Sequence, residues 1–193
     1  MPETGFPGAA APPRPLLTVG HGTLEEPALP ALLAGAGVAA LVDVRRFPGS
    51  RRHPHVGRDA LARRLPEAGI AYRWDERLGG RRPVPPDSPD VVLRVAAFRG
   101  YAAHMRSAGF AAAVDELLAA AATTRTAVMC SESLWWRCHR RLLADFVQLV
   151  RGVPVEHLMH DGRLTRHRPT DGARVTPEGL LVYDAGADSL PWE

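Results

Sequence analysis

Short apolar segments alternate with longer helix-like segments along this chain, and this alternation constrains the fold more than any other feature. Patterns typical of buried strands cover residues 16–19, 38–44, 70–74, 126–129, 154–158 and 180–183. Patterns typical of helices cover residues 59–68, 91–105, 110–122 and 136–150. Strands that alternate with helices predict an α/β fold with a mainly parallel sheet flanked by helices and joined by right-handed crossovers.

One further helix is expected after the first strand. Thr23 precedes Leu24-Glu25-Glu26, which is the capping-box pattern of a helix start, and the helix should end near Gly35 or Gly37. Because Pro30 lacks the backbone N–H that a helix interior needs, we expect this helix to start late or to bend.

The length of the chain predicts a single domain. Its 193 residues suit one core, since single cores usually stay under roughly 250 residues. We expect the domain, with Rossmann-like or rhodanese-like layering, over residues 16–184, a flexible tail at 1–15 and a second tail at 185–193. The N-terminus lacks the order of a signal peptide, and no apolar run approaches the ~20 residues of a membrane helix. These features predict a cytoplasmic protein without a membrane partner.

The positive charge of the chain is carried by arginine alone and is concentrated in one segment. The absence of lysine excludes Schiff-base and P-loop lysines from any mechanism. Residues 45–82 hold 11 arginines and four acidic residues, a net of +7 in a chain whose net charge is +3. Such a segment indicates either a polyanionic or phosphate-bearing ligand or a solvated basic surface.

Polar residues follow three of the predicted strands. Gly20-His21-Gly22 follows the first, Arg45 and Arg46 follow the second with Asp43 just inside it, and Cys130-Ser131-Glu132 follows a later one. Ligands of parallel α/β sheets bind at the carboxyl ends of the strands. We therefore expect these three groups to form one site.

The segment from Cys130 to Arg140 passes from a strand into a helix. A helix N-terminus favours anions and lowers the pKa of a nearby cysteine, and His139 and Arg140 in the first turns could face the same site. Each residue also has a structural interpretation. Cys130 and Cys138 could be buried hydrophobic residues, and Glu132 a helix cap.

The sequence resembles the domain-of-unknown-function 488 family from about residue 16 to about residue 184. The motifs that carry the resemblance are Thr18-Val-Gly-His-Gly22, Leu41-Val-Asp-Val-Arg45, Gly69-Ile-Ala-Tyr72, Leu78-Gly-Gly-Arg81, Phe98-Arg-Gly-Tyr-Ala-Ala-His-Met105, Met129-Cys-Ser-Glu132 and Cys138-His-Arg140. Two departures stand out: Gly22 replaces a common serine, and Pro30 lies in a helix usually free of proline. The resemblance implies an α/β fold with a shared polar site.

These features favour an enzyme that acts on nucleic acid or on a nucleotide. Arginine would hold phosphate through its planar fork, an acidic residue would serve as acid or base, and Trp135 or Trp136 would stack a base. The candidate catalytic residues are Glu132, Cys130, Asp43 and His21. The candidate substrate- or phosphate-binding residues are Arg45, Arg46, Arg51, Arg140, His139 and Trp136.

Three alternatives remain open from the sequence. Cysteine chemistry at Cys130 would resemble that of rhodanese-like sulfurtransferases and phosphatases, although bulky residues 134–136 fill the loop that should wrap the sulfur. A zinc or iron site could draw on five residues, which are His21, Cys130, Glu132, Cys138 and His139. A non-enzymatic nucleic-acid-binding module would need only the basic segment.

Overall fold

The computed structural model describes residues 13–50 and 53–184. Most of the two expected tails, and the candidate phosphate ligand Arg51, lie outside these residues. The strands are β1 (Leu16–Gly20), β2 (Ala40–Asp43), β3 (Ala71–Trp74), β4 (Thr126–Cys130), β5 (Val155–Leu158), β6 (Leu164–Arg166), β7 (Ala173–Val175) and β8 (Leu181–Tyr183). The α-helices are α1 (Ala28–Gly35), α2 (Arg58–Glu67), α3 (Ala96–Met105), α4 (Ala108–Thr123) and α5 (Arg140–Arg151).

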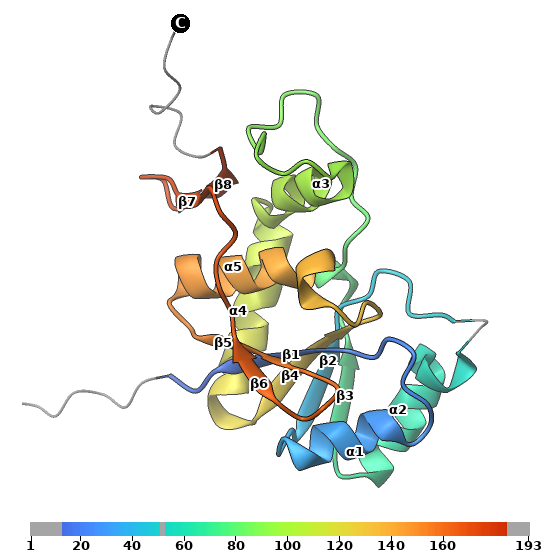
Figure 1. Cartoon of the computed structure of the whole chain (residues 1–193). Coiled ribbons are helices and arrows are strands. Elements are labelled where there is room, and N and C mark those ends of the chain that lie inside the picture. The colour runs from blue at the N-terminus through green and yellow to red at the C-terminus, as the bar shows by residue number, and fades with distance from the viewer. Residues whose placement is uncertain (1–12, 51–52, 185–193) are drawn as a thin grey trace, which may run out of the picture.

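The main sheet has six strands in the order β3-β2-β4-β1-β5-β6, and the first five run parallel (Figure 1). Only β6 is antiparallel, and β7 and β8 form a separate hairpin. This arrangement confirms the predicted α/β fold with a mainly parallel sheet. None of the helices in the described ranges has the length and hydropathy needed to cross a bilayer.

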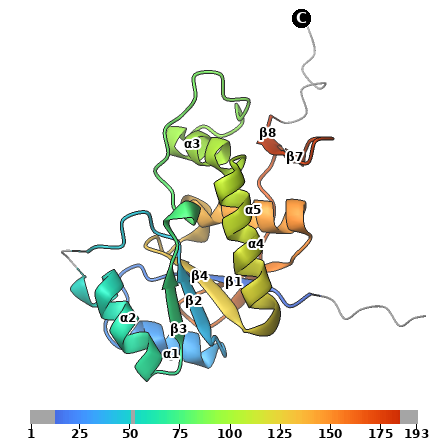
Figure 2. The same ribbon diagram turned by 180° about the vertical axis from the view of Figure 1, so that it is seen from behind.

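Helices cover both faces of the sheet. Successive strand residues point to opposite faces, so Leu17 and Leu41 pack with α1 and α2, whereas Leu16 and Val42 pack with α3, α4 and α5. Figures 1 and 2 show these two helical layers on either side of the strands. The near-continuous apolar strands read from the sequence reflect burial on both faces.

The strand order places the ends of β2, β4 and β1 next to one another. The chain moves outward from β1 to β2 and β3, then returns through α3 and α4 to insert β4 between β2 and β1. This reversal puts the carboxyl ends of the three strands at a topological switch point, where ligands of such sheets bind. The three polar groups expected to converge therefore lie on one edge.

Several element boundaries differ from those that the sequence predicts. Helix α1 begins only at Ala28, without a side-chain cap, so the expected capping box at Thr23 is wrong. Pro30 then falls in the first turn, where a missing N–H costs little. The helix predicted from residue 91 begins only at Ala96, after a turn and irregular backbone. The helix predicted from residue 136 is a 3₁₀ turn, Trp135–Arg137, followed by α5 from Arg140.

Candidate functional site

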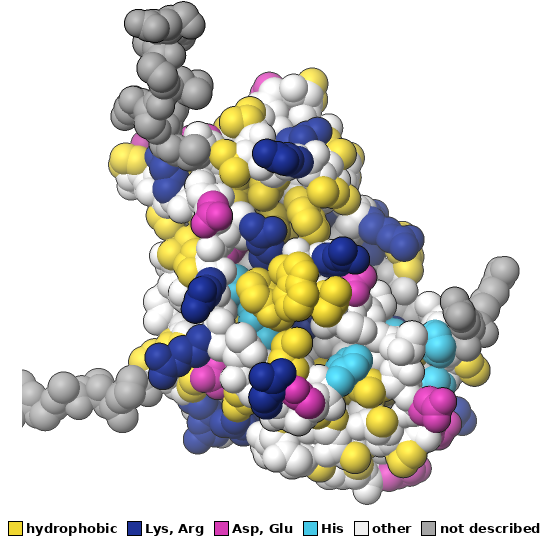
Figure 3. Space-filling model, in the orientation of Figure 1, with side chains coloured by type: hydrophobic (Ala, Val, Ile, Leu, Met, Phe, Trp, Pro, Cys, Tyr) yellow, Lys and Arg dark blue, Asp and Glu magenta, His cyan; other side chains and the backbone are white. Residues whose placement is uncertain are grey.

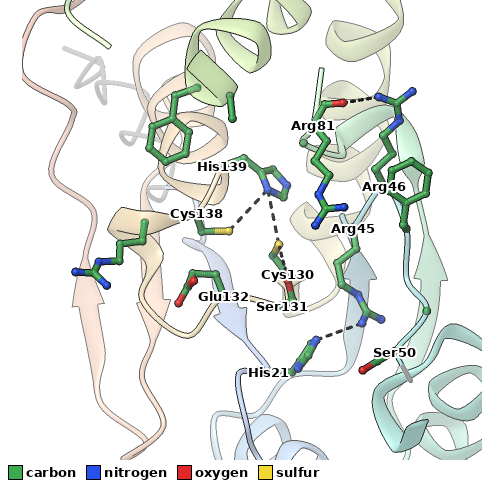
Figure 4. A pocket seen from close by; sticks show the side chains of 16 residues that line it. His21, Arg45, Arg46, Ser50, Arg81, Cys130, Ser131, Glu132, Cys138 and His139 are labelled. Carbon is green, nitrogen blue, oxygen red and sulfur yellow. Dashed lines mark hydrogen bonds between the residues drawn. The ribbon is translucent and has the colours of Figure 1, made fainter. Parts of the chain in front are cut away.

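A cavity of about 420 Å³ opens at the switch point of the sheet (Figure 4). Its walls come from the ends of β1, β2 and β4, from the loops after β2 and β3, and from the start of α3 and of α5. The charged, sulfur-bearing and aromatic residues that line it are His21, Arg45, Arg46, Phe47, Arg81, Phe98, Glu132, Arg137, Cys130, Cys138 and His139.

Two glycines let the loops after β1 and β4 approach closely. A Cβ atom at Gly20 would lie 1.9 Å from the carbonyl oxygen of Glu132. Gly22 has a φ of +53°, and a Cβ there would lie 2.0 Å from the Ser133 hydroxyl oxygen. A serine at position 22, as the family resemblance would favour, does not fit this backbone.

A buried ion pair between Asp43 and Arg45 lies at one wall of the cavity. The Asp43 carboxylate accepts hydrogen bonds from Arg45 Nε at 2.8 Å and Nη2 at 2.5 Å, and from the Tyr72 hydroxyl at 2.8 Å. Arg45 also donates to the Val56 carbonyl. Both side chains are buried, Asp43 completely. Asp43 is thus not placed to act as an acid or base, and most donors of Arg45 are already engaged.

His21 is held neutral beside this pair. Its Nδ1 lies 3.0 Å from the Gly22 carbonyl oxygen, and its Nε2 lies 3.2 Å from Arg45 Nη1, which donates to it. Burial and then the Arg45 charge lower the pKa of His21 to about 4. With its Nε2 lone pair directed at Arg45, His21 is not oriented as a metal ligand.

The two cysteines and His139 meet at the end of the cavity. His139 Nδ1 lies 3.7 Å from the sulfur of Cys130 and 3.7 Å from that of Cys138 (Figure 4). The hydrogen bond with Cys138 and burial raise the pKa of Cys130 to about 12. Cys130 is therefore a thiol at neutral pH, which argues against the hypothesis that it is the nucleophile.

Cys138 differs from its neighbour. Burial would raise the pKa of its thiol, but the hydrogen bond with Cys130 and the positive charge of Arg140 lower it to about 6. The sequence placed Cys138 on a helix. In the structure it precedes α5 and lines the cavity.

Three arginines that line the cavity have guanidinium donors without a partner among the described residues. Arg46 donates to the Arg81 carbonyl and lies over the Phe47 ring, 5.4 Å from its centroid. The guanidinium groups of Arg81 and Arg137 have no hydrogen bond or ion pair within the described part of the chain. Sequence reasoning did not name Arg81 and Arg137 as ligands, although both lie in segments that it singled out.

Two other candidates do not face the cavity. Arg140 is 1% exposed and donates to Thr18 Oγ1 and to the Glu132 carbonyl, so it is not available to hold phosphate. Trp136 is 44% exposed but does not line the cavity, and Trp135 stacks on His157 at 4.1 Å between ring centroids. Glu132 does line it. Its carboxylate accepts one hydrogen bond, from the Leu134 amide at 3.3 Å.

The fold and the cavity define an α/β protein with a cationic, cysteine-containing pocket at the switch point of a parallel sheet. The chain belongs to the family described as domain of unknown function DUF488, whose model matches residues 27–147. Among the described residues that line the cavity, only His21 lies outside the matched range. No curated protein and no solved structure matches the chain.

Proposed function

We propose that the protein is an enzyme that acts on a nucleotide, either free or at the end of a nucleic acid. The observation that carries this proposal is that three arginines, Arg46, Arg81 and Arg137, line one cavity. With Arg45 neutralised by Asp43, these three charges and the Glu132 carboxylate leave the cavity with about two positive charges. A phosphate monoester carries about −1.5 to −2 at pH 7, which this charge complements.

The backbone of Arg81 supports a ligand-holding role for that residue. Its φ of 57° lies in the left-handed region, which a side chain of this kind rarely adopts. Among the described residues outside glycine, only Arg81 has a positive φ. Arg46 donates to the carbonyl of Arg81 and fixes this conformation. Strained backbone of this kind concentrates at ligand-binding positions.

The rest of the basic segment favours a small ligand over a long nucleic acid. Arg73 and Arg77 pair with Asp75 and Glu116, and Arg64 pairs with Glu26. On the face seen in Figure 3, arginines are separated by other side chains and form no continuous stripe. The cavity volume lies within the range of small-molecule sites, and the 63% exposed ring of Phe47 at its wall can stack a base.

Arg81→Ala and Arg137→Ala should each weaken the binding of a nucleoside monophosphate by about 10- to 100-fold. Each removes a charge-assisted hydrogen bond, and such bonds contribute about 1.5–3 kcal/mol. Isothermal titration of adenosine and guanosine monophosphates measures the change. Arg94→Ala, which removes an exposed arginine outside the cavity, should bind like the parent protein. Equal affinity in all four proteins would refute the proposed phosphate ligands.

Glu132→Gln should retain nucleotide binding and lower the rate of any hydrolysis by about 10²- to 10⁴-fold, because a side-chain general acid or base contributes that much. Glu132 is the carboxylate that lines the cavity in the described part of the chain. Single-turnover assays of nuclease, glycosylase and nucleotide hydrolysis compare the variant with the parent. Equal rates would remove Glu132 from the mechanism, and binding without turnover in either protein would favour a non-enzymatic module.

A further inference from the structure

The sulfur atoms of Cys130 and Cys138 and the Nδ1 atom of His139 form a compact set of soft donors. All three atoms lie within 4.8 Å of one another. In tetrahedral zinc sites the Zn–S and Zn–N bonds, about 2.3 and 2.0–2.1 Å, place sulfur and nitrogen ligands about 3.6 Å apart. The two sulfur–nitrogen distances here are both 3.7 Å. Both sulfur–nitrogen spacings therefore already match those of a zinc centre.

Neighbouring groups orient these donors as they do in metal sites. His139 Nε2 lies 3.1 Å from the Val44 carbonyl oxygen, which accepts its proton and leaves the Nδ1 lone pair facing the two sulfurs. A metal-bound histidine almost always donates its other N–H in this way. Arg140 Nε donates to the Cys138 sulfur at 3.4 Å, so its buried charge favours a thiolate ligand there.

We propose that Cys130, Cys138 and His139 bind one zinc ion. The other two residues that the sequence put forward, His21 and Glu132, do not belong to this set of donors. Three protein ligands leave a fourth position, and because all three residues line the cavity, that position is open to it (Figure 4). Three ligands with one open position are typical of catalytic zinc rather than structural zinc, which is closed by four.

The zinc centre would give the cavity a second means of binding an anion. A metal ion with an open position binds a water molecule or an oxygen of the ligand and polarises it. Arg81 and Arg137 line the same cavity, so the metal and these arginines would share one ligand-binding space. The zinc proposal does not depend on the identity of the ligand, and metal binding is measured without one.

Cobalt(II) is the direct probe of this site. The reduced full-length protein should bind one Co(II) per chain, with a thiolate-to-metal charge-transfer band and the intense visible bands of tetrahedral coordination. Zinc should displace the cobalt and abolish both. Cys130→Ser, Cys138→Ser and His139→Asn should each weaken zinc binding by at least about 100-fold in competition with a chromophoric chelator. His53→Asn, which removes an imidazole outside the cavity, should bind zinc like the parent protein.

Two results would overturn the proposal. The first is a reduced, folded parent protein that gives no charge-transfer band with Co(II). The second is zinc binding of equal strength in the parent and in folded His139→Asn, which keeps both cysteines. Titrating a nucleoside monophosphate into metal-free protein tests the proposed function separately from the zinc proposal. Arg81 and Arg137 would still bind phosphate in protein that holds no zinc.

Discussion

Asp43→Ala is expected to lower the free energy of unfolding by about 3–5 kcal/mol, because it leaves the buried charge of Arg45 without its partner. The carboxylate is fully buried and accepts from two nitrogens of Arg45 and from the Tyr72 hydroxyl. Alanine leaves these donors unsatisfied in the interior, where an unpaired charge cannot be resolvated. Urea denaturation at neutral pH, followed by circular dichroism, measures the loss.

The matched control is Asp59→Ala. Asp59 is exposed and pairs with Arg58 at 3.3 Å, so its removal should change stability by at most about 1 kcal/mol. The double variant Asp43→Leu/Arg45→Met should recover much of the loss, since replacing both members of a buried pair with apolar residues is often neutral. Similar losses of stability in Asp43→Ala and Asp59→Ala would show that the buried pair of Asp43 and Arg45 contributes no more to folding than an exposed pair.

Asp145→Ala should also cost at least about 3 kcal/mol, because it removes the acceptor that anchors the C-terminal segment to α5. The carboxylate accepts from His167 Nε2, the Thr170 amide and hydroxyl, and the Tyr183 hydroxyl at 2.6–2.9 Å. Each buried donor left without a partner costs about 1–3 kcal/mol. The same urea titration measures this loss.

Asp115→Ala provides the comparison for Asp145→Ala. Asp115 lies on α4, is exposed and pairs with Arg151 at 2.7 Å. Its removal should change stability by about 1 kcal/mol or less, since exposed ion pairs contribute little. Hydrogen exchange adds a local readout: amides of β7 and β8 should lose protection in Asp145→Ala and keep it in Asp115→Ala. Unchanged protection of the hairpin in Asp145→Ala would contradict the anchoring role.

The convergence of the three polar groups could be predicted because it depends on local patterns and one topological rule. Apolar runs identify β1, β2 and β4, and parallel strands put their carboxyl ends on one edge. His21, Arg45, Arg46, Cys130 and Glu132 all line the cavity at that edge. The family match over residues 27–147 also agrees with the resemblance that the motifs indicate.

Local patterns could not predict which side chains at that edge are free to contact a ligand. Arg140 and Arg137 are three residues apart in the segment from Cys130 to Arg140, yet the first is buried and the second lines the cavity. Buried Arg140 donates to the hydroxyl of Thr18, which is 122 residues away in sequence. Strands β6 and β7 escaped prediction because three-residue strands give almost no periodic signal, whereas β8 falls on the strand expected at residues 180–183.

The sequence by itself determined the α/β fold, the edge of the sheet at which the polar residues gather and the cationic character of that edge. These properties follow from side-chain periodicity and charge along neighbouring residues. Only the tertiary structure decided that the Asp43 carboxylate is paired with Arg45, and that Cys130, Cys138 and His139 face one another. Such pairings are set by the burial and by the long-range contacts that pack the loops after β1, β2 and β4 together.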